Sequence, residues 1–282
     1  MRTIRIIITA LALLALPAMS RAQYIVTDTI IPERIVVKSS QLGVTLLNNL
    51  DTYLSNYNYK GLGLNYSHEA FRDACTGNYH WKYQKLLNIT AGYAIQGSNL
   101  QYAALISYNW SGYHPFKVAQ GLTLLAGAQI QLEGGALYNP AGGNNPAAAK
   151  LRTALAASGM AIYHFPVLRS EWIARYQIDI PLIGAMFAPE FGQSYYEIFG
   201  LGHAKDIVAF THPGNNPSWR HMLSLDIPIK ATTLRLSYIA DLYQSRINDI
   251  NCHIYRNTFS IGFTRTIFKV KKENKLNDYS PY

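Results

Sequence analysis

The chain is poor in cysteine and in charge. It has 2 cysteines among 282 residues, and Asp, Glu, Lys and Arg make up only 15% of it, while 49% of its residues are hydrophobic. A soluble domain usually carries about 25% charged residues. Cys75 and Cys252 could form one disulfide in an exported protein. The strand order inferred below puts them at opposite ends of the fold, so we expect no bond.

The chain also lacks a transmembrane helix, because no run of about 18 apolar residues follows Gln23. The segment before Gln23 has the parts of a secretory signal peptide: a basic start, a short apolar run from Ile6 to Leu16, and small residues in Ser20-Arg21-Ala22. We therefore expect residues 1–22 to be removed on export. No cysteine lies near this site, which excludes a lipoprotein anchor.

Basic residues outnumber acidic ones, and the formal net charge is +9. The basic side chains are scattered rather than gathered into a stripe, so we expect no nucleic-acid partner. Lysines cluster only near the C-terminus, at Lys269, Lys271, Lys272 and Lys275. We interpret this cluster as a solvated tail close to lipid headgroups.

The clearest pattern is an alternation with a period of two over residues 169–182. One face would carry Trp172, Ala174, Tyr176, Ile178, Ile180 and Leu182, and the other Glu171, Ile173, Arg175, Gln177 and Asp179. A helix would mix these two sets, whereas a strand separates them. An apolar face opposite a charged face is typical of a membrane-spanning β-barrel, which meets lipid on one side and its lumen on the other. A soluble barrel also alternates, with its apolar face turned inward.

The same alternation recurs along the chain and predicts an all-β fold, an antiparallel transmembrane β-barrel. The other strands are expected at residues 41–49, 61–69, 87–93, 100–110, 122–133, 151–164, 222–227, 234–242 and 256–267, although the alanine-rich 151–164 could also be helical. Turns or loops are expected at residues 51–58, 72–79, 96–99, 114–115, 139–150 and 230–231. Both ends of a bacterial barrel normally lie in the periplasm, so the strand number is even. We expect about twelve strands, with a hairpin in residues 184–211; the alternative is ten strands, with these residues folded into the lumen.

These patterns divide the chain into a signal peptide (1–22), a periplasmic lead-in (23–40), a barrel (41–268) and a basic, polar periplasmic tail (269–282). We expect the barrel to lie in the outer membrane of a Gram-negative cell, in contact with outer-membrane lipid. The last strand ends in Phe268, and a terminal aromatic resembles the signal read by the barrel-assembly machinery. Aromatic girdles are expected from residues near strand ends, namely Tyr53, Tyr57, Tyr59, Trp81, Tyr83, Tyr108, Trp110, Tyr138 and Trp172.

In such a barrel the charged face lines the lumen. The predicted lumen-facing residues are Glu69, Glu133, Glu171, Arg175, Asp179, Asp226, Arg235, Asp241 and Arg256. Charges of both signs could set the selectivity of an open pore. They could equally form a salt-bridged network that plugs a narrow barrel. The sequence leaves both interpretations open.

Residues 181–199 form the least strand-like segment of the second half. Two prolines and two glycines indicate a specific folded loop. This loop could constrict a pore or bind a ligand through Glu190, Ser194, Tyr195, Tyr196 and Glu197. The alternative is an ordered hairpin or gate without a ligand.

Enzymatic motifs are weak. Gln193-Ser194-Tyr195 lacks the G-x-S-x-G pattern of hydrolases, and His68-Glu69 lacks the second histidine of a zinc-protease motif. Ser194, His203 and Asp206 are close in sequence, but such trios are common in loops. His203 and His212 are too isolated to indicate a metal site. We expect no enzyme activity, no cofactor and no metal.

Three stretches carry a resemblance to a known family. Asn144-Asn145-Pro146, residues 181–199 and Leu225-Asp226-Ile227-Pro228 are similar to segments of a family of exported proteins from Bacteroides-type bacteria, classed as a domain of unknown function. The resemblance covers nearly the whole mature chain. It implies an outer-membrane barrel and brings no established activity and no site residues.

Three hypotheses about function follow. The first is a porin-like, narrow channel or passive transporter for small polar solutes. The second is a closed structural or interaction barrel whose extracellular loops bind a partner or a glycan. An outer-membrane lipid hydrolase is a distant third.

Overall fold

The computed structural model describes residues 34–76, 79–143, 145–168, 170–229 and 232–269. The predicted signal peptide, most of the predicted lead-in and all of the predicted tail except Lys269 lie outside the described residues. The elements are β1 (Arg34–Asp51), β2 (Ser55–Thr76), β3 (Tyr79–Gln96), β4 (Asn99–Ala119), β5 (Leu122–Tyr138), β6 (Ala147–Val167), β7 (Ser170–Phe187), η1 (Tyr196–Gly200, a π-helical turn), β8 (Val208–Thr211), β9 (Trp219–Ile229), β10 (Thr232–Ile247) and β11 (Ile250–Lys269). Across these ranges no helix is long and apolar enough to cross a membrane.

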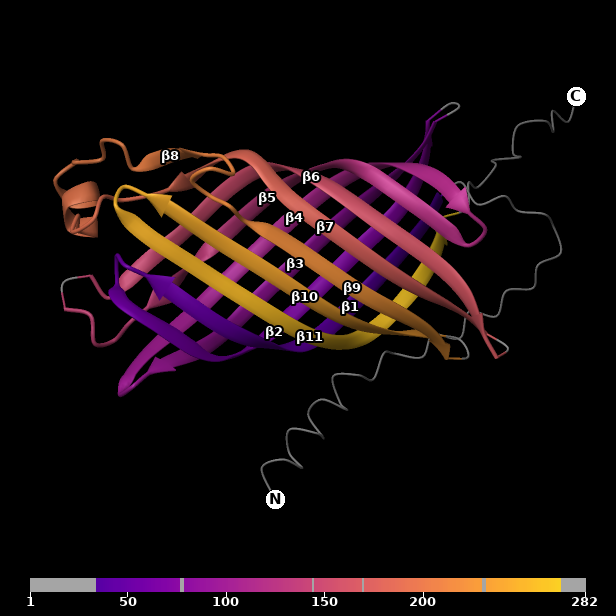
Figure 1. Cartoon of the computed structure of the whole chain (residues 1–282), viewed down its shortest axis with the longest axis horizontal. Coiled ribbons are helices and arrows are strands. Elements are labelled where there is room, and N and C mark those ends of the chain that lie inside the picture. The colour runs from indigo at the N-terminus through magenta and orange to yellow at the C-terminus, as the bar shows by residue number, and fades with distance from the viewer. Residues whose placement is uncertain (1–33, 77–78, 144, 169, 230–231, 270–282) are drawn as a thin grey trace, which may run out of the picture. The chain divides into compact units, whose positions relative to one another are not determined.

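Ten of the strands form a closed antiparallel barrel (Figure 1). From β1 to β7, neighbouring strands in the sequence are paired. β7 then pairs with β9, β9 with β10 and β10 with β11, and β11 closes the ring by pairing with β1. The remaining strand, β8, pairs only with β7, through Gly184–Phe187. The predicted number of twelve is therefore wrong and the alternative of ten is correct. The segment from Gly184 to Thr211 extends β7 and adds one short strand, because Pro189 and the glycines interrupt any longer ladder.

The two ends of the barrel differ in their connections. The end at which β1 begins and β11 finishes is called the terminal end, and the opposite end is called the loop end. At the terminal end, β4 and β5 are joined by the tight turn Gln120-Gly121. Gly121 has φ +78°, and a Cβ there would lie 2.5 Å from the His164 carbonyl oxygen, so only glycine fits. The longer connections, residues 139–146 and 188–218, lie at the loop end.

The strands are longer than the sequence pattern predicts. β1 begins at Arg34, inside the predicted lead-in, and β6 begins at Ala147, inside the predicted loop 139–150. The predicted turn at His114-Pro115 is wrong, because β4 continues to Ala119. Pro115 lies past Tyr113, the last described partner of β3, so its missing N–H costs no bond to β3. Along β4 the alternation of buried and exposed residues is clear only in the middle of the strand, whereas backbone pairing continues beyond it.

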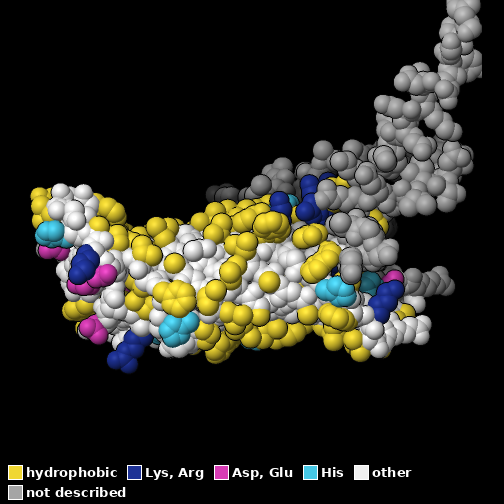
Figure 2. Space-filling view, turned by 90° about the horizontal axis from the view of Figure 1, so that it is seen from above, with side chains coloured by type: hydrophobic (Ala, Val, Ile, Leu, Met, Phe, Trp, Pro, Cys, Tyr) yellow, Lys and Arg dark blue, Asp and Glu magenta, His cyan; other side chains and the backbone are white. Residues whose placement is uncertain are grey.

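The alternation of faces is as the sequence predicts. Large apolar side chains cover the outer wall, among them Leu64, which is 72% exposed. Residues one position away point inward and are buried, as Asn65 is beside Leu64. Figure 2 shows the apolar side chains spread over the wall, with charged side chains mostly towards its two ends. The alanine-rich stretch 151–164 is also a strand, since Ala154 and Ala156 pack inside while Leu151 and Leu155 face out.

The predicted aromatic girdle is formed in part. Tyr57, Trp81, Tyr108, Trp110 and Tyr138 are exposed on the outer wall. Tyr59 is instead buried inside the barrel, where its hydroxyl accepts a hydrogen bond of 2.9 Å from Asn139 Nδ2. Tyr53 contacts the loop end, where its hydroxyl donates to the Gln193 carbonyl oxygen at 2.8 Å.

The cysteines are separated as the strand order predicts. Cys252 lies near the loop end of β11, where it pairs in register with Asp51, and its thiol is buried and free. Cys75 lies near the terminal end of β2, in register with His80. The prediction that the strand order places these two residues at opposite ends of the barrel is therefore confirmed.

Candidate functional site

The interior of the barrel consists of a charged middle between two apolar layers. Towards the terminal end the apolar layer contains Phe71, Tyr113, Leu125, Met160 and Ile162. Towards the loop end it contains Leu47, Ala103, Leu105, Leu137, Met186, Ala188, Tyr243, Cys252 and Ile254. Inward positions on long strands supply all of these residues except Ala188, which follows β7, and the charged groups between the layers are kept from bulk water.

The first charged cluster is centred on Glu69 of β2. Glu69 Oε1 accepts hydrogen bonds of 2.6 Å from Arg175 Nη2 and of 2.6 Å from Gln84 Nε2. Its other oxygen pairs with Arg235. Arg235 also donates in bidentate fashion to Asp226, at 2.5 and 2.6 Å, which is the strongest geometry for an arginine–carboxylate pair. Two carboxylates thus balance two arginines.

The second cluster joins Asp179 of β7 to Arg220 of β9. Arg220 donates to Asp179 Oδ2 at 3.0 Å from Nε and at 2.6 Å from Nη2. The same guanidinium reaches Gln129 of β5 at 3.0 Å. Ser158 and Gln177 complete the shell by donating to Asp179. This cluster is neutral overall and fully hydrogen-bonded around its carboxylate, which offsets the cost of burying the charges.

The third cluster lies nearer the loop end. Glu133 Oε2 accepts from Arg152 at 3.0 and 2.5 Å, and Glu133 Oε1 accepts from Arg256 at 2.5 Å. Arg256 also pairs with Asp241 at 2.7 Å. Beyond this cluster, Lys150 pairs with the buried Asp51 at 2.5 Å.

Several of these contacts run across the lumen rather than along its wall. Glu69 and Arg175 stand on β2 and β7, and Glu133 and Arg256 stand on β5 and β11. In the ring of ten, both pairs join opposite strands. The described cavities inside the barrel have volumes of about 20 Å³ each, which is room for roughly one water molecule. The interior is therefore filled by side chains.

The structure brings together all but one of the predicted lumen-facing residues. Glu69, Glu133, Arg175, Asp179, Asp226, Arg235, Asp241 and Arg256 belong to the clusters just described. Glu171 does not, because it lies at the rim of the terminal end, where its carboxylate is 3.0 Å from His164.

Sequence reasoning missed four charged members of the interior. Arg152 lies in the alanine-rich strand, where the pattern was weak, and Asp51 and Lys150 were assigned to loops. Arg220 lies two residues before Met222, so extending the alternation of that strand by one step would have found it.

The predicted loop residues form a compact cap at the loop end, here defined as residues 188–218. The Ser194 N–H donates to Glu197 Oε2 at 2.7 Å, and the Glu197 N–H donates to Ser194 Oγ at 3.2 Å, which is the reciprocal pattern of a capping box before η1. The bond from Ser194 lowers the pKa of Glu197 below its usual value. Tyr195 packs on Phe187, and its hydroxyl accepts from the Ala149 N–H at 2.6 Å. Glu190 and Tyr196 are exposed.

The residues considered for catalysis do not form a catalytic arrangement. Ser194 Oγ is held by the Glu197 N–H, and His203 contacts Glu197 and Gln193 through its backbone. In the part of the chain that the structure describes, no hydrogen bond joins the side chains of Ser194, His203 and Asp206. Among those same residues, no group of His, Cys, Asp and Glu side chains could hold a metal ion.

A family model described as "Protein of unknown function (DUF3316)" matches residues 6–274. The chain belongs to this family. The match spans the three stretches that carry the resemblance noted in the sequence, so that resemblance is confirmed. No curated protein matches the chain.

Among solved structures, this DUF3316 chain is similar to several barrels at low identity. The transport unit of the autotransporter AIDA-I from Escherichia coli shares 9% identity with a TM-score of 0.40, over 94% of this chain and 97% of that chain. The outer membrane protease OmpT from Escherichia coli shares 7%, with a TM-score of 0.39, over 86% and 99%. The COG4313 outer membrane channel from Pseudomonas putida F1 shares 10%, with a TM-score of 0.36, over 89% and 99%. Likeness at this level transfers no activity to the chain.

Proposed function

We propose that the chain is an outer-membrane barrel that is closed to solutes and serves as a rigid scaffold, presenting its loop end to a partner outside the membrane. The membrane location is supported by the direction of the two faces, since the apolar face is turned outward and the charged face inward. Apolar side chains such as Leu64 and Phe259 are exposed on the outer wall, while Arg235 and Glu69 are buried inside. A barrel in water would bury the first pair and expose the second.

The lengths of the connections support an orientation. Outer-membrane barrels have short periplasmic turns and longer extracellular loops. Here the connection Gln120-Gly121 lies at the terminal end, and residues 139–146 and 188–218 lie at the loop end. The loop end is therefore proposed to face outward and the terminal end to face the periplasm.

The cross-lumen ion pairs carry the proposal that the barrel is closed. A solute moving along the axis would have to separate Glu69 from Arg175 and Glu133 from Arg256. Separating a buried pair leaves uncompensated charges in a medium of low dielectric constant, which is strongly unfavourable. The apolar layers above and below the charged middle add two further barriers to ions. This filled interior favours the closed barrel over the narrow channel.

The cap supports a role in interaction. Phe191, Tyr196 and Phe199 are 62%, 71% and 72% exposed. The cap is nevertheless held against the barrel by hydrogen bonds. The Tyr195 hydroxyl accepts from the Ala149 N–H, and Asn248 Nδ2 donates to the Ala188 carbonyl oxygen at 2.6 Å. Exposed aromatic rings on a preorganised surface are typical of sites that contact a partner.

The test is the single-channel conductance of the mature protein, refolded and inserted into a planar bilayer. We expect no conductance steps from protein whose insertion is verified by protease protection of the barrel and by its altered migration on a gel without heating. Reproducible steps with a defined conductance would contradict the closed barrel and support the channel for small polar solutes.

A further inference from the structure

The wall of the barrel is incomplete between β7 and β9. The ladder between these strands runs from Ile173–Asp226 to Asp179–Arg220 and then stops. Pro181, which follows, has no N–H to donate, and the register of β7 against β6 shifts at this point. β7 is paired again only from Gly184, with β8 in place of β9. Residues 180–183 of β7 thus have no strand partner on this side.

The opposite border of this break is also weakly paired. β10 pairs with β9 only as far as Leu242, which faces Trp219. Closer to the loop end, β10 contacts the end of the cap through single hydrogen bonds. Arg246 N donates to Asn215 O at 2.9 Å, and Gln244 N donates to Ser218 Oγ at 3.1 Å. The wall between the two borders is therefore built by a loop rather than by a ladder.

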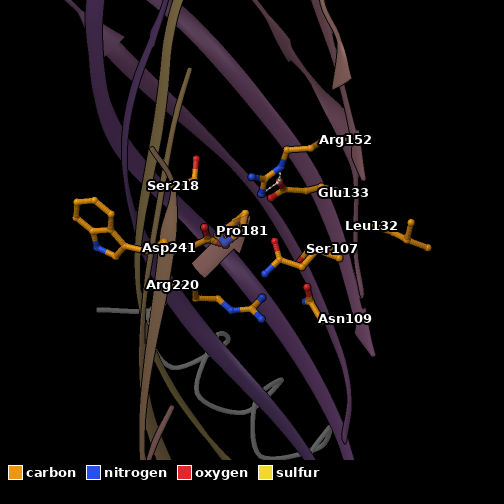
Figure 3. Close-up of a pocket in the computed structure, with 11 residues that line it drawn as sticks. Ser107, Asn109, Leu132, Glu133, Arg152, Pro181, Ser218, Arg220 and Asp241 are labelled. Atoms are coloured by element: carbon orange, nitrogen blue, oxygen red, sulfur yellow. Dashed lines mark hydrogen bonds and ion pairs between the residues drawn. The ribbon is translucent and has the colours of Figure 1, made fainter. Parts of the chain in front are cut away.

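A cavity lies at this break (Figure 3). Pro181, Ser218 and Trp219 line it from the wall, and Trp219 is 43% exposed on the outer surface. From the interior it is lined by Ser107, Asn109, Gln131, Glu133, Arg152, Arg220 and Asp241. Its lining thus runs from a residue of the outer wall to two arginines of the interior, Arg152 and Arg220.

Three buried donors among the lining residues have no hydrogen-bond partner in the described structure: Ser107 Oγ, Asn109 Nδ2 and Arg152 Nη1. The Arg152 side chain is only 10% exposed. The two carboxylates of the lining are paired with arginines, since Glu133 accepts from Arg152 and Arg256, and Asp241 Oδ2 accepts from Arg256. Buried donors are normally satisfied. This set therefore fits an acceptor that comes from outside the chain.

We propose that this cavity binds an oxygen of a phosphate or carboxylate group, with the rest of the group seated in the wall break beside Trp219. The cavity has a volume of about 20 Å³, which accommodates roughly one oxygen-sized atom. Three donors without a described partner line this one cavity, together with Arg220, and donors of this kind recognise phosphate and carboxylate oxygens. The group belongs to a lipid of the surrounding membrane or to a free anion. This site is additional to the proposed scaffold role and does not depend on it.

The experiment uses Trp219 as the reporter. In full-length mature protein carrying Trp81→Phe, Trp110→Phe and Trp172→Phe, Trp219 is the sole tryptophan of the barrel. The protein, held in a neutral detergent, is titrated with dodecyl phosphate, with inorganic phosphate and with a dodecyl chain on a neutral sugar head. We expect a saturable fluorescence change with dodecyl phosphate and none with the neutral amphiphile. An equal response to inorganic phosphate identifies a free anion as the source and also supports the site.

The donors are tested by a matched pair of variants. Ser107→Ala combined with Asn109→Ala removes two donors without touching an ion pair, and we expect the affinity for the phosphate to fall about ten-fold. Ser224→Ala is the control, because its hydroxyl is also buried and without a partner in the described structure but does not line this cavity. If the double variant does not fold, Ser107→Ala alone is used, with an expected loss of about three-fold.

The proposal is overturned by any of three results. The first is the absence of a saturable response to either phosphate. The second is an equal response to the neutral amphiphile, which would indicate apolar adsorption. The third is unchanged binding by the donor variants, which would mean that water alone satisfies Ser107, Asn109 and Arg152.

Discussion

Glu69 and Arg175 stand on opposite strands of the barrel, and their side chains meet across the lumen at 2.6 Å. The two residues are 106 positions apart in the sequence. Because Arg235 pairs with the same carboxylate, Glu69 ties three strands of the ring, β2, β7 and β10, to one point. This relationship gives the barrel its filled interior and makes Glu69 a sensitive position for stability.

Replacing Glu69 by alanine is expected to destabilise the barrel by about 3–5 kcal/mol, the usual effect of removing one partner from a buried ion pair. Arg175 and Arg235 would be left buried, with Arg175 losing its only described carboxylate. Unfolding of the refolded protein in urea and lipid vesicles, followed by tryptophan fluorescence, measures the change. Glu171→Ala is the control, since its exposed pair with His164 should contribute less than about 1 kcal/mol. Equal effects of the two variants would contradict the assignment.

Removing both cross-lumen pairs should open the lumen. The variant has Glu69, Arg175, Glu133 and Arg256 all changed to serine. It loses two negative and two positive charges, so the net charge of the interior does not change. We expect conductance steps from this variant in a planar bilayer under conditions where the unchanged protein is silent. Silence from inserted variant protein would show that the apolar layers alone close the barrel.

The capping box makes the cap sensitive to acid. The Ser194 N–H donates to the Glu197 carboxylate and lowers the pKa of Glu197 below its ordinary value of 4.5. A carboxyl with a lowered pKa stabilises the fold above its ordinary pKa, and that contribution is lost as the pH falls through the lowered pKa. We expect pepsin to cleave the cap faster at about pH 3 than at about pH 5 when each rate is divided by that of an unstructured reference peptide at the same pH, and we expect Glu197→Ala to abolish this difference. Glu190→Ala, which removes an exposed carboxylate outside the box, should retain the difference.

The buried thiol of Cys252 should be protected by the fold. It lies in the apolar layer at the loop end, beside Tyr243 and Ile254. In a Cys75→Ser protein, a polymer-linked maleimide is expected to leave Cys252 unmodified until the barrel is denatured, and a gel shift reports the reaction. Rapid labelling of the folded protein would indicate that the loop end admits solutes.

The sequence predicts the wall of this protein well and its interior only in part. The alternation around Leu64 or Phe259 separates outward from inward positions correctly, because side-chain direction in a strand depends on the backbone alone. The predicted number of twelve strands is wrong, because whether residues 184–211 form a hairpin depends on partners that the local pattern does not reveal. The same holds for Arg152, whose partner Glu133 lies on the neighbouring strand.

By itself the sequence determined that the chain is built of β-strands, each with an apolar face and a polar or charged face. Each of these properties repeats every two residues and can be counted along one strand. Only the tertiary structure decided that the charges meet across the lumen and that the wall is broken beside Pro181. Those features depend on the register of every ladder around the ring and on its closure, because a shift of one strand would move Arg175 away from Glu69.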